Sequence, residues 1–210
     1  MEHLHQNPYV FEARPWELKK TETIDVMDAV GSNIRVDTYD WEVKRVLPRI
    51  NEEINEEWIS DKTRYACDGL KSQRLDHPLK KINNEFKKIS WKEAYETIAE
   101  KIKITSSDKI AGFIGDLTNM ETMFVTKEFF EKTIKSKNLE ARDDNTYINT
   151  EDRTNYLFNS KINGIEEADF ILLIGANPRL EATMLNARIR KNYVANKTEI
   201  YSIGDLGDQT

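Results

Sequence analysis

The sequence predicts an α/β protein in which a small β-rich subdomain precedes a Rossmann-like, doubly wound parallel sheet half that we expect to be truncated. Three observations predict this fold class. Residues 33–48 alternate apolar and polar side chains, as half-buried strands do. Residues 168–174 are apolar almost without alternation, as strands of parallel sheets are. From about residue 85, helical and strand patterns follow one another, which is the order of a doubly wound fold.

The β-rich part contains a predicted hairpin. Ile34 and Val36 alternate with polar residues, the pattern resumes at Val43, and Pro48 closes the second strand because proline cannot donate to a ladder. The acidic segment that follows, residues 51–61, is expected to be irregular surface structure anchored by the ring of Trp58.

The α/β part begins with a helix signal. Ser90 and Glu93 form a capping box, and an apolar stripe at helical spacing is expected to face a core: Trp91, Tyr95, Ile98 and Ile102. Residues 110–114 are a short buried-strand candidate. A second helix is expected to open with a capping pattern at 118–121 and to turn Met123, Phe130 and Ile134 inward.

The last predicted strand–helix–strand unit comprises residues 168–174, a helix over about 181–190, and a strand over 198–203. The sequence stops soon after this strand, whereas a doubly wound sheet would normally continue. We therefore predict an incomplete α/β domain at 85–210, a β-rich subdomain at 18–76, and a docking or linker segment at 1–17.

Composition narrows the class of protein. The 210 residues are 39% hydrophobic and 32% charged, with a net charge of −6 and both signs interspersed, which does not favour nucleic-acid binding. The longest apolar run, residues 170–176, is far shorter than the roughly 20 residues needed to cross a bilayer, so we expect no membrane span. The N-terminus has no apolar signal core.

Cys67 is the single cysteine of the sequence. A self-contained iron–sulfur or Cys-only zinc site takes about four thiolates, so one thiol excludes such a site and any internal disulfide. No histidine lies close in sequence to activate the thiol, and we interpret Cys67 as a buried or half-buried bystander.

Three further groups each allow two interpretations. The loop Gly175 to Asn177 either contacts a nucleotide or is a tight strand-to-helix turn; it lacks the Gly-x-Gly-x-x-Gly spacing, which favours the turn. Basic residues near the end of the next helix either hold an anion or acidic partner or complement the helix dipole, which is favoured: Arg188, Arg190 and Lys191. Acidic residues without any metal-binding spacing are interpreted as solvated: Asp25, Asp28, Glu52, Glu53, Glu56 and Glu57.

Several stretches resemble the large iron–sulfur subunit of NADH:quinone oxidoreductase, respiratory complex I, of the mitochondrial and alphaproteobacterial type. They are residues 11–18, 23–34, 47–49, 51–64 and 164–169, and the resemblance extends over nearly the whole chain from about Pro8. The run Asn-Glu-Glu-Ile-Asn-Glu-Glu-Trp-Ile-Ser-Asp-Lys at 51–62 is long and unusual, and it carries most of the signal.

The resemblance implies the second, molybdopterin-oxidoreductase-like half of that subunit. In the family, 2Fe-2S and 4Fe-4S clusters lie on a ferredoxin-like first half that this sequence does not contain. The molybdopterin enzymes open this half with Cys-x2-Cys-x3-Cys and a fourth cysteine, a pattern that falls on Asp25, Asp28, Ser32 and Cys67. Residues 18–76 therefore resemble a degenerate 4Fe-4S subdomain of the Mo/W bis-MGD type, and we expect no cofactor on this chain. The complex I branch is not known to hold the pterin, so no binding is carried over to Gly175 or Asn177.

The expected role is a structural, non-catalytic part of the complex I peripheral arm, with no catalytic residues on this chain. Expected partners are the other peripheral-arm subunits, especially the cluster-bearing half, at the matrix side of the mitochondrial inner membrane or the cytoplasmic side of a bacterial plasma membrane. Tyr9, Phe11 and Trp16 are candidates for docking, or else hold the chain to its own α/β core. The alternatives are a nucleotide- or pterin-binding oxidoreductase fragment using Gly175 and Asn177, and a free-standing regulatory module.

Overall fold

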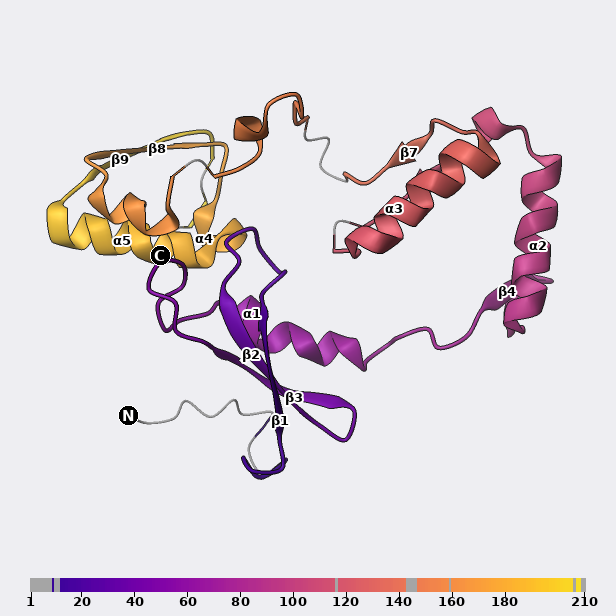
Figure 1. Cartoon of the computed structure of the whole chain (residues 1–210), viewed down its shortest axis with the longest axis horizontal. Coiled ribbons are helices and arrows are strands. Elements are labelled where there is room, and N and C mark those ends of the chain that lie inside the picture. The colour runs from indigo at the N-terminus through magenta and orange to yellow at the C-terminus, as the bar shows by residue number, and fades with distance from the viewer. Residues whose placement is uncertain are drawn as a thin grey trace. The chain divides into compact units, whose positions relative to one another are not determined.

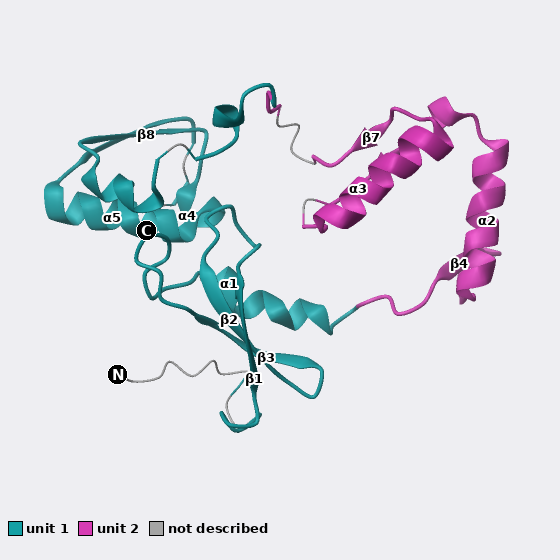
Figure 2. Ribbon diagram, in the orientation of Figure 1, with its two compact units in different colours: residues 1–73, 150–210 teal, residues 74–149 magenta. Residues whose placement is uncertain are grey.

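The computed structural model describes residues 9, 12–115, 117–142, 147–158, 160–205 and 207–208. The chain divides into two compact units, the first made of residues 1–73 with 150–210 and the second of residues 74–149 (Figure 2). The predicted domain boundaries at 18–76 and 85–210 stay predictions.

The first unit contains a three-stranded antiparallel sheet with strand order β1 (Lys19–Ile24), β2 (Asn33–Tyr39) and β3 (Glu42–Pro48) (Figure 1). The predicted hairpin is confirmed. Its turn places Asp40 and Trp41 at positive φ values of 48° and 67°, as the twist of a tight two-residue hairpin requires. A small core lies on one side of the sheet and consists of Ile34, Val46 and Ile59.

A buried ion-pair triad lies on β2 and β3. Asp37 is fully buried and accepts hydrogen bonds from Arg35 Nε and Arg45 Nε, both at 2.8 Å. The Tyr9 ring lies 4.6 Å from the Arg45 guanidinium and is 6% exposed, so Tyr9 packs against β3 of the three-stranded sheet. Trp16 is 80% exposed, and Phe11 lies outside the described residues.

The sheet is followed by helix α1 (Asp61–Tyr65) and a 3₁₀ turn, η2 (Ala66–Leu70). Ser60 begins α1 because its hydroxyl accepts the amide of Thr63 at 3.0 Å. The segment before it is irregular, as predicted, but Trp58 is 56% exposed and does not anchor it. That segment is held instead by the buried side chain of Asn55.

The rest of the first unit is a parallel pair, β8 (Phe170–Ile174) and β9 (Glu199–Ile203), with α4 (Pro178–Glu181) and α5 (Thr183–Asn196) between them in sequence. Helix α5 runs along this pair (Figure 1). The 3₁₀ turns η5 (Arg153–Asn155) and η6 (Ile162–Glu167) precede it.

The loop after β8 has the geometry of a strand-to-helix turn. Gly175 has a φ of +57°, and the Asn177 side chain accepts the amide of Leu180. Pro178 is the first residue of α4. A backbone N–H at this position has no partner within the helix, so proline loses no hydrogen bond there. These are the features that the turn interpretation of Gly175 and Asn177 expects.

The second unit contains a hairpin, β4 (Leu79–Ile82) with β5 (Glu85–Lys88), which was not predicted from the sequence. It continues with α2 (Trp91–Ile104), η3 (Ser107–Lys109), β6 (Gly112–Phe113), α3 (Met120–Glu128), the π-helical η4 (Phe129–Ile134) and β7 (Leu139–Glu140).

The helix starts of the second unit are only partly as predicted. Ser90 caps α2 by accepting the amide of Glu93, as expected. The cap of α3 is Asn119, one residue after the predicted Thr118. Phe130 and Ile134 are buried, as predicted.

The apolar stripe of α2 does not face a core within the described structure. Trp91, Tyr95 and Ile98 are 60%, 63% and 55% exposed, and Ala94 is the buried residue of the helix. The prediction of an inward-facing stripe is wrong for this unit, because helical periodicity identifies an apolar face but not what covers it.

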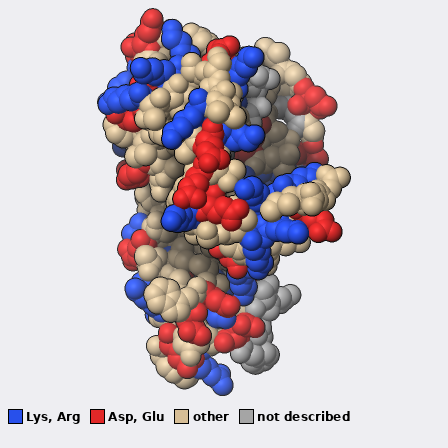
Figure 3. Space-filling view, turned by 90° about the vertical axis from the view of Figure 1, so that its right-hand side faces the viewer, with Lys and Arg blue, Asp and Glu red and all other residues tan. Residues whose placement is uncertain are grey.

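The chain is a mixed α/β protein with small sheets. Parallel pairing occurs in two separate two-stranded sheets, β6 with β7 and β8 with β9, and the larger doubly wound sheet stays a prediction. Among the described residues, no helix is long and apolar enough to span a bilayer. On the face seen in Figure 3, basic and acidic side chains are interspersed.

Candidate functional site

Asp25, the first of the four positions that resemble cluster ligands, is buried and already bonded. One carboxylate oxygen accepts the hydroxyl of Thr63 at 2.6 Å and the other accepts the amide of Met27 at 3.0 Å. The interpretation of Asp25 as a solvated acid is therefore wrong. Its carboxylate joins the turn after β1 to helix α1.

Asp28 and Ser32 complete the turn before β2. Burial raises the pKa of Asp28 above its ordinary value, against the opposing hydrogen bond that its carboxylate accepts from the amide of Val30 at 2.9 Å. Ser32 is 1% exposed, and its hydroxyl oxygen has no hydrogen-bond partner among the described residues. Its backbone carbonyl accepts the amide of Asp25 at 2.8 Å, which closes the turn.

Cys67 lies in η2 and is partly buried. Burial raises the pKa of its thiol above the ordinary value, and the charge of Asp68 raises it further. Its sulfur lies 3.8 Å from the carbonyl of Arg64. A raised pKa keeps the thiol protonated at neutral pH, which agrees with its interpretation as a half-buried bystander.

Asn55 organises the segment between β3 and α1. Its side chain is 2% exposed and lies between parts of the chain that are distant in sequence. Its oxygen accepts the amide of Asn33 at 2.9 Å, and its nitrogen donates to the carbonyls of Arg49 at 3.2 Å and Trp58 at 3.1 Å. The segment therefore has a fixed shape without a core of its own.

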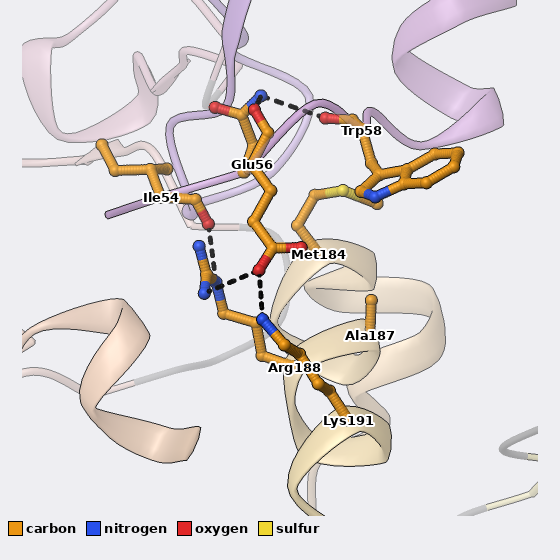
Figure 4. A pocket seen from close by; sticks show the side chains of 8 residues that line it. Ile54, Glu56, Trp58, Met184, Ala187, Arg188 and Lys191 are labelled. Atoms are coloured by element: carbon orange, nitrogen blue, oxygen red, sulfur yellow. Dashed lines mark hydrogen bonds and ion pairs between the residues drawn. The ribbon is translucent and has the colours of Figure 1, made fainter. Parts of the chain in front are cut away.

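Arg188 of α5 reaches this same segment (Figure 4). Its side chain is 4% exposed, and it donates to the carbonyls of Ile54 at 3.0 Å and Glu52 at 2.7 Å. It also forms an ion pair with Glu166 of η6. The guanidinium thus joins three segments of the first unit.

Lys191, one turn further along α5, extends the cluster. Its ammonium lies 2.5 Å from a carboxylate oxygen of Glu56 and 2.9 Å from one of Glu166. Hydrogen bonds to Glu56 and then Glu166 raise the pKa of Lys191. Burial acts to raise the pKa of Glu166, but hydrogen bonds from Lys191 and Arg188 outweigh it and hold that pKa below its usual value.

These contacts correct two sequence interpretations. Arg188 and Lys191 do not mainly complement the helix dipole, because they pair with Glu56 and Glu166. Glu56 is correspondingly not a solvated acid. Arg190 is exposed, but α5 continues to Asn196 and has no basic residue in its last turn, so the dipole interpretation does not hold for Arg190 either.

A pocket of about 140 Å³ lies beside the cluster and is lined by Trp58, Met184, Ala187 and both cations (Figure 4). Because the cations of Arg188 and Lys191 already face carboxylates, this pocket is poorly suited to an anionic ligand. The cluster is a structural contact that connects α5 with residues 52–56 and with Glu166 of η6. No local sequence signal marks Asn55 or Glu166, since their partners lie 22 residues away in the chain.

Comparison with known proteins extends to both parts of the chain. The molybdopterin oxidoreductase family model matches residues 74–210. The chain belongs to the molybdopterin oxidoreductase family. A second model, described as the NADH-ubiquinone oxidoreductase NDSU1/NuoG-like 4Fe-4S domain, matches residues 18–68.

Relatives of this molybdopterin oxidoreductase family member are large subunits of NADH-ubiquinone oxidoreductases. It is 52% identical over 206 residues to the mitochondrial NADH-ubiquinone oxidoreductase 78 kDa subunit of Candida albicans. It is 43% identical to the NADH-ubiquinone oxidoreductase 75 kDa subunit of Reclinomonas americana and 47% identical to the mitochondrial 78 kDa subunit of Neurospora crassa. These matches cover 96–99% of this chain but only 28–32% of the relatives.

The match at residues 18–68 corrects the expectation that this chain carries no cofactor. A 4Fe-4S domain model covers the β1–β3 sheet and α1, and it points to an iron–sulfur cluster on this chain. The prediction of no cofactor is wrong on this finding.

The donor set of this chain does not by itself fit a cubane cluster. The irons of such a cluster prefer about four thiolates, and the sequence contains one cysteine. Within the described ranges, no group of three or more His, Cys, Asp or Glu side chains is placed to hold a metal. Any remaining ligands would have to come from protein outside these 210 residues.

Proposed function

We propose that this chain is a non-catalytic part of the peripheral arm of NADH:quinone oxidoreductase, where it supports electron transfer from NADH to quinone by positioning other parts. The observation that carries this proposal is its identity of 43–52% to subunits of that enzyme over 96–99% of its own length. The chain spans less than a third of the length of those relatives, and in this proposal the activity of the whole subunit lies largely in sequence outside it.

The arrangement of side chains favours a positioning role. Asp25 is engaged with Thr63, and Arg188 and Lys191 are engaged with Glu56 and Glu166. Each of these charged groups holds one segment against another. Electron tunnelling slows steeply as the distance between redox centres grows, so a rigid body beside the centres serves the reaction without entering it.

The partners that fit this role are the other peripheral-arm subunits, above all the ferredoxin-like, cluster-bearing half of the same subunit. The site of action would be the matrix side of the mitochondrial inner membrane or the cytoplasmic side of a bacterial plasma membrane, by peripheral association.

Affinity purification of the tagged chain from its own cells, followed by native gel electrophoresis, tests this proposal. We expect the chain to migrate with NADH-oxidising activity and with other subunits of the enzyme. Migration only as a free protein would contradict the proposal. Iron and acid-labile sulfide, measured in the assembly and in the isolated chain, would show where the cluster indicated at residues 18–68 obtains its ligands.

A further inference from the structure

The contacts of Arg188 form the first link of a continuous chain of hydrogen bonds. A guanidinium presents five donors in a rigid fork, so it can hold several acceptors in fixed directions. Here the acceptors are the carbonyls of Glu52 and Ile54 and the carboxylate of Glu166. The two carbonyls lie 136 and 134 residues away in sequence, which makes this a long-range tie.

Asn55 forms the second link, and it follows Ile54 directly in the chain. While Arg188 holds one side of this segment, the Asn55 side chain binds its other side to the first residue of β2, Asn33, through that residue's amide. The same side chain also holds the carbonyls of Arg49 and Trp58. Residues 52–56 are therefore fixed from both sides.

The third link leads to the turn that carries Asp25 and Ser32, two of the four positions that resemble cluster ligands. Asn33 directly follows Ser32, whose carbonyl accepts the amide of Asp25 at 2.8 Å. The Asn33 carbonyl in turn accepts the amide of Arg49 at 2.9 Å. A shift of the 52–56 segment would be transmitted to the turn that carries Asp25 and Ser32, because every intermediate group is bonded at both ends.

We propose that Arg188 and Asn55 are positioning residues that tie the iron–sulfur domain at residues 18–68 to helix α5, so that the two open together rather than separately. The coupling itself is a property of this chain alone. Only its role in the assembled enzyme rests on the proposed function. In the complex, α5 would fix the orientation of the iron–sulfur domain.

Amide hydrogen exchange of the full chain tests this coupling. Arg188→Met removes the donors and the charge but keeps an unbranched apolar stem, and Arg190→Met is the matched control because Arg190 is exposed on the same helix. We expect Arg188→Met to accelerate exchange of the amides of Asn33, Glu56 and Asp25 by about tenfold or more. Amides of the β4–β5 hairpin and the Arg190→Met variant should exchange at the original rates.

One further variant separates positioning from simple stabilisation. Arg188→Lys keeps the charge but not the fork, so it should restore the Glu166 ion pair and only part of the protection at Glu56 and Asn33. Acceleration confined to α5 and residues 51–58, with the Asn33 amide unchanged, would overturn the proposal.

If Arg188→Met fails to fold, native-state hydrogen exchange of the unaltered chain in low urea tests the same coupling between residues 18–68 and α5. Coupled parts open together, so the amides of Asn33, Glu56 and Asn192 should share one dependence on urea. Opening of Asn33 at a much lower urea concentration than Asn192 would refute the coupling. Failure of the chain to purify with the respiratory enzyme, while this exchange behaviour holds, would refute only the proposed function.

Discussion

Replacing Asp37 by asparagine tests the buried ion-pair triad of the sheet. Asp37 is fully buried, and its carboxylate accepts three hydrogen bonds. Two come from Arg35, at 2.8 and 3.1 Å, and one comes from Arg45, at 2.8 Å. Hydrogen bonds to charged groups contribute about 1.5–3 kcal/mol each. The asparagine side chain keeps one oxygen acceptor, but its NH2 group would face a guanidinium, which can only donate. At least one of the three hydrogen bonds is therefore lost.

The two arginines limit the loss because their side chains are 31% and 17% exposed and can regain water. We therefore expect Asp37→Asn to lower the free energy of unfolding by about 3 kcal/mol, at the low end of values for a broken buried pair. For a chain of this size, that corresponds to a fall in the melting temperature of roughly 6–12 °C.

The pH dependence follows from the pKa of Asp37. Burial alone would raise this pKa, but the hydrogen bonds from Arg35 and then Arg45 outweigh it and lower the pKa below its ordinary value. The stabilisation is therefore present above the unfolded-state pKa of about 3.9 and is lost as pH falls through the lower folded-state value.

Urea unfolding followed by circular dichroism at pH 7 and at about pH 3 measures both effects. The matched control is Asp40→Asn at the exposed tip of the same hairpin, where positive φ suits asparagine. The difference between Asp37→Asn and the unaltered chain should shrink at the lower pH. Equal urea midpoints for Asp37→Asn and Asp40→Asn at pH 7 would refute the reasoning.

Three further predictions concern other groups of the chain. Asn192→Leu should lower the free energy of unfolding by about 2–4 kcal/mol, measured by urea titration, because the 1% exposed amide donates to the carbonyls of Ile165 and Ala168, and both of these hydrogen bonds would be lost. Cys67 should react with a maleimide at pH 7 more slowly than free cysteine, since burial raises its pKa; an equal rate would contradict this. In an NMR titration the Glu140 carboxyl should show a pKa of about 2, chiefly because Arg142 donates to it, and Arg142→Gln should raise that pKa.

The local elements of the fold were predictable because their signals are local. The hairpin over residues 33–48 alternates, Ser90 has its capping partner three residues on, and Gly175 is followed by an asparagine cap and a proline. The β4–β5 hairpin was missed although its turn, Asn83 and Asn84 at positive φ, is a pair of residues that tolerates the left-handed region. There the short strands are rich in lysine and carry little alternation to detect.

The structural contact at Arg188 was not predictable, and the reason is physical. A basic residue near a helix C-terminus is favourably placed for the dipole in any helix, so the local rule gives the same answer whether or not a partner exists. Two of the acceptors that decide the contact are backbone carbonyls more than 130 residues away, and every sequence contains such carbonyls. Side-chain identity therefore cannot reveal this contact. Asp25 was not predictable for a related reason: the hydroxyl that its carboxylate accepts, that of Thr63, lies 38 residues later in the chain, outside any local pattern.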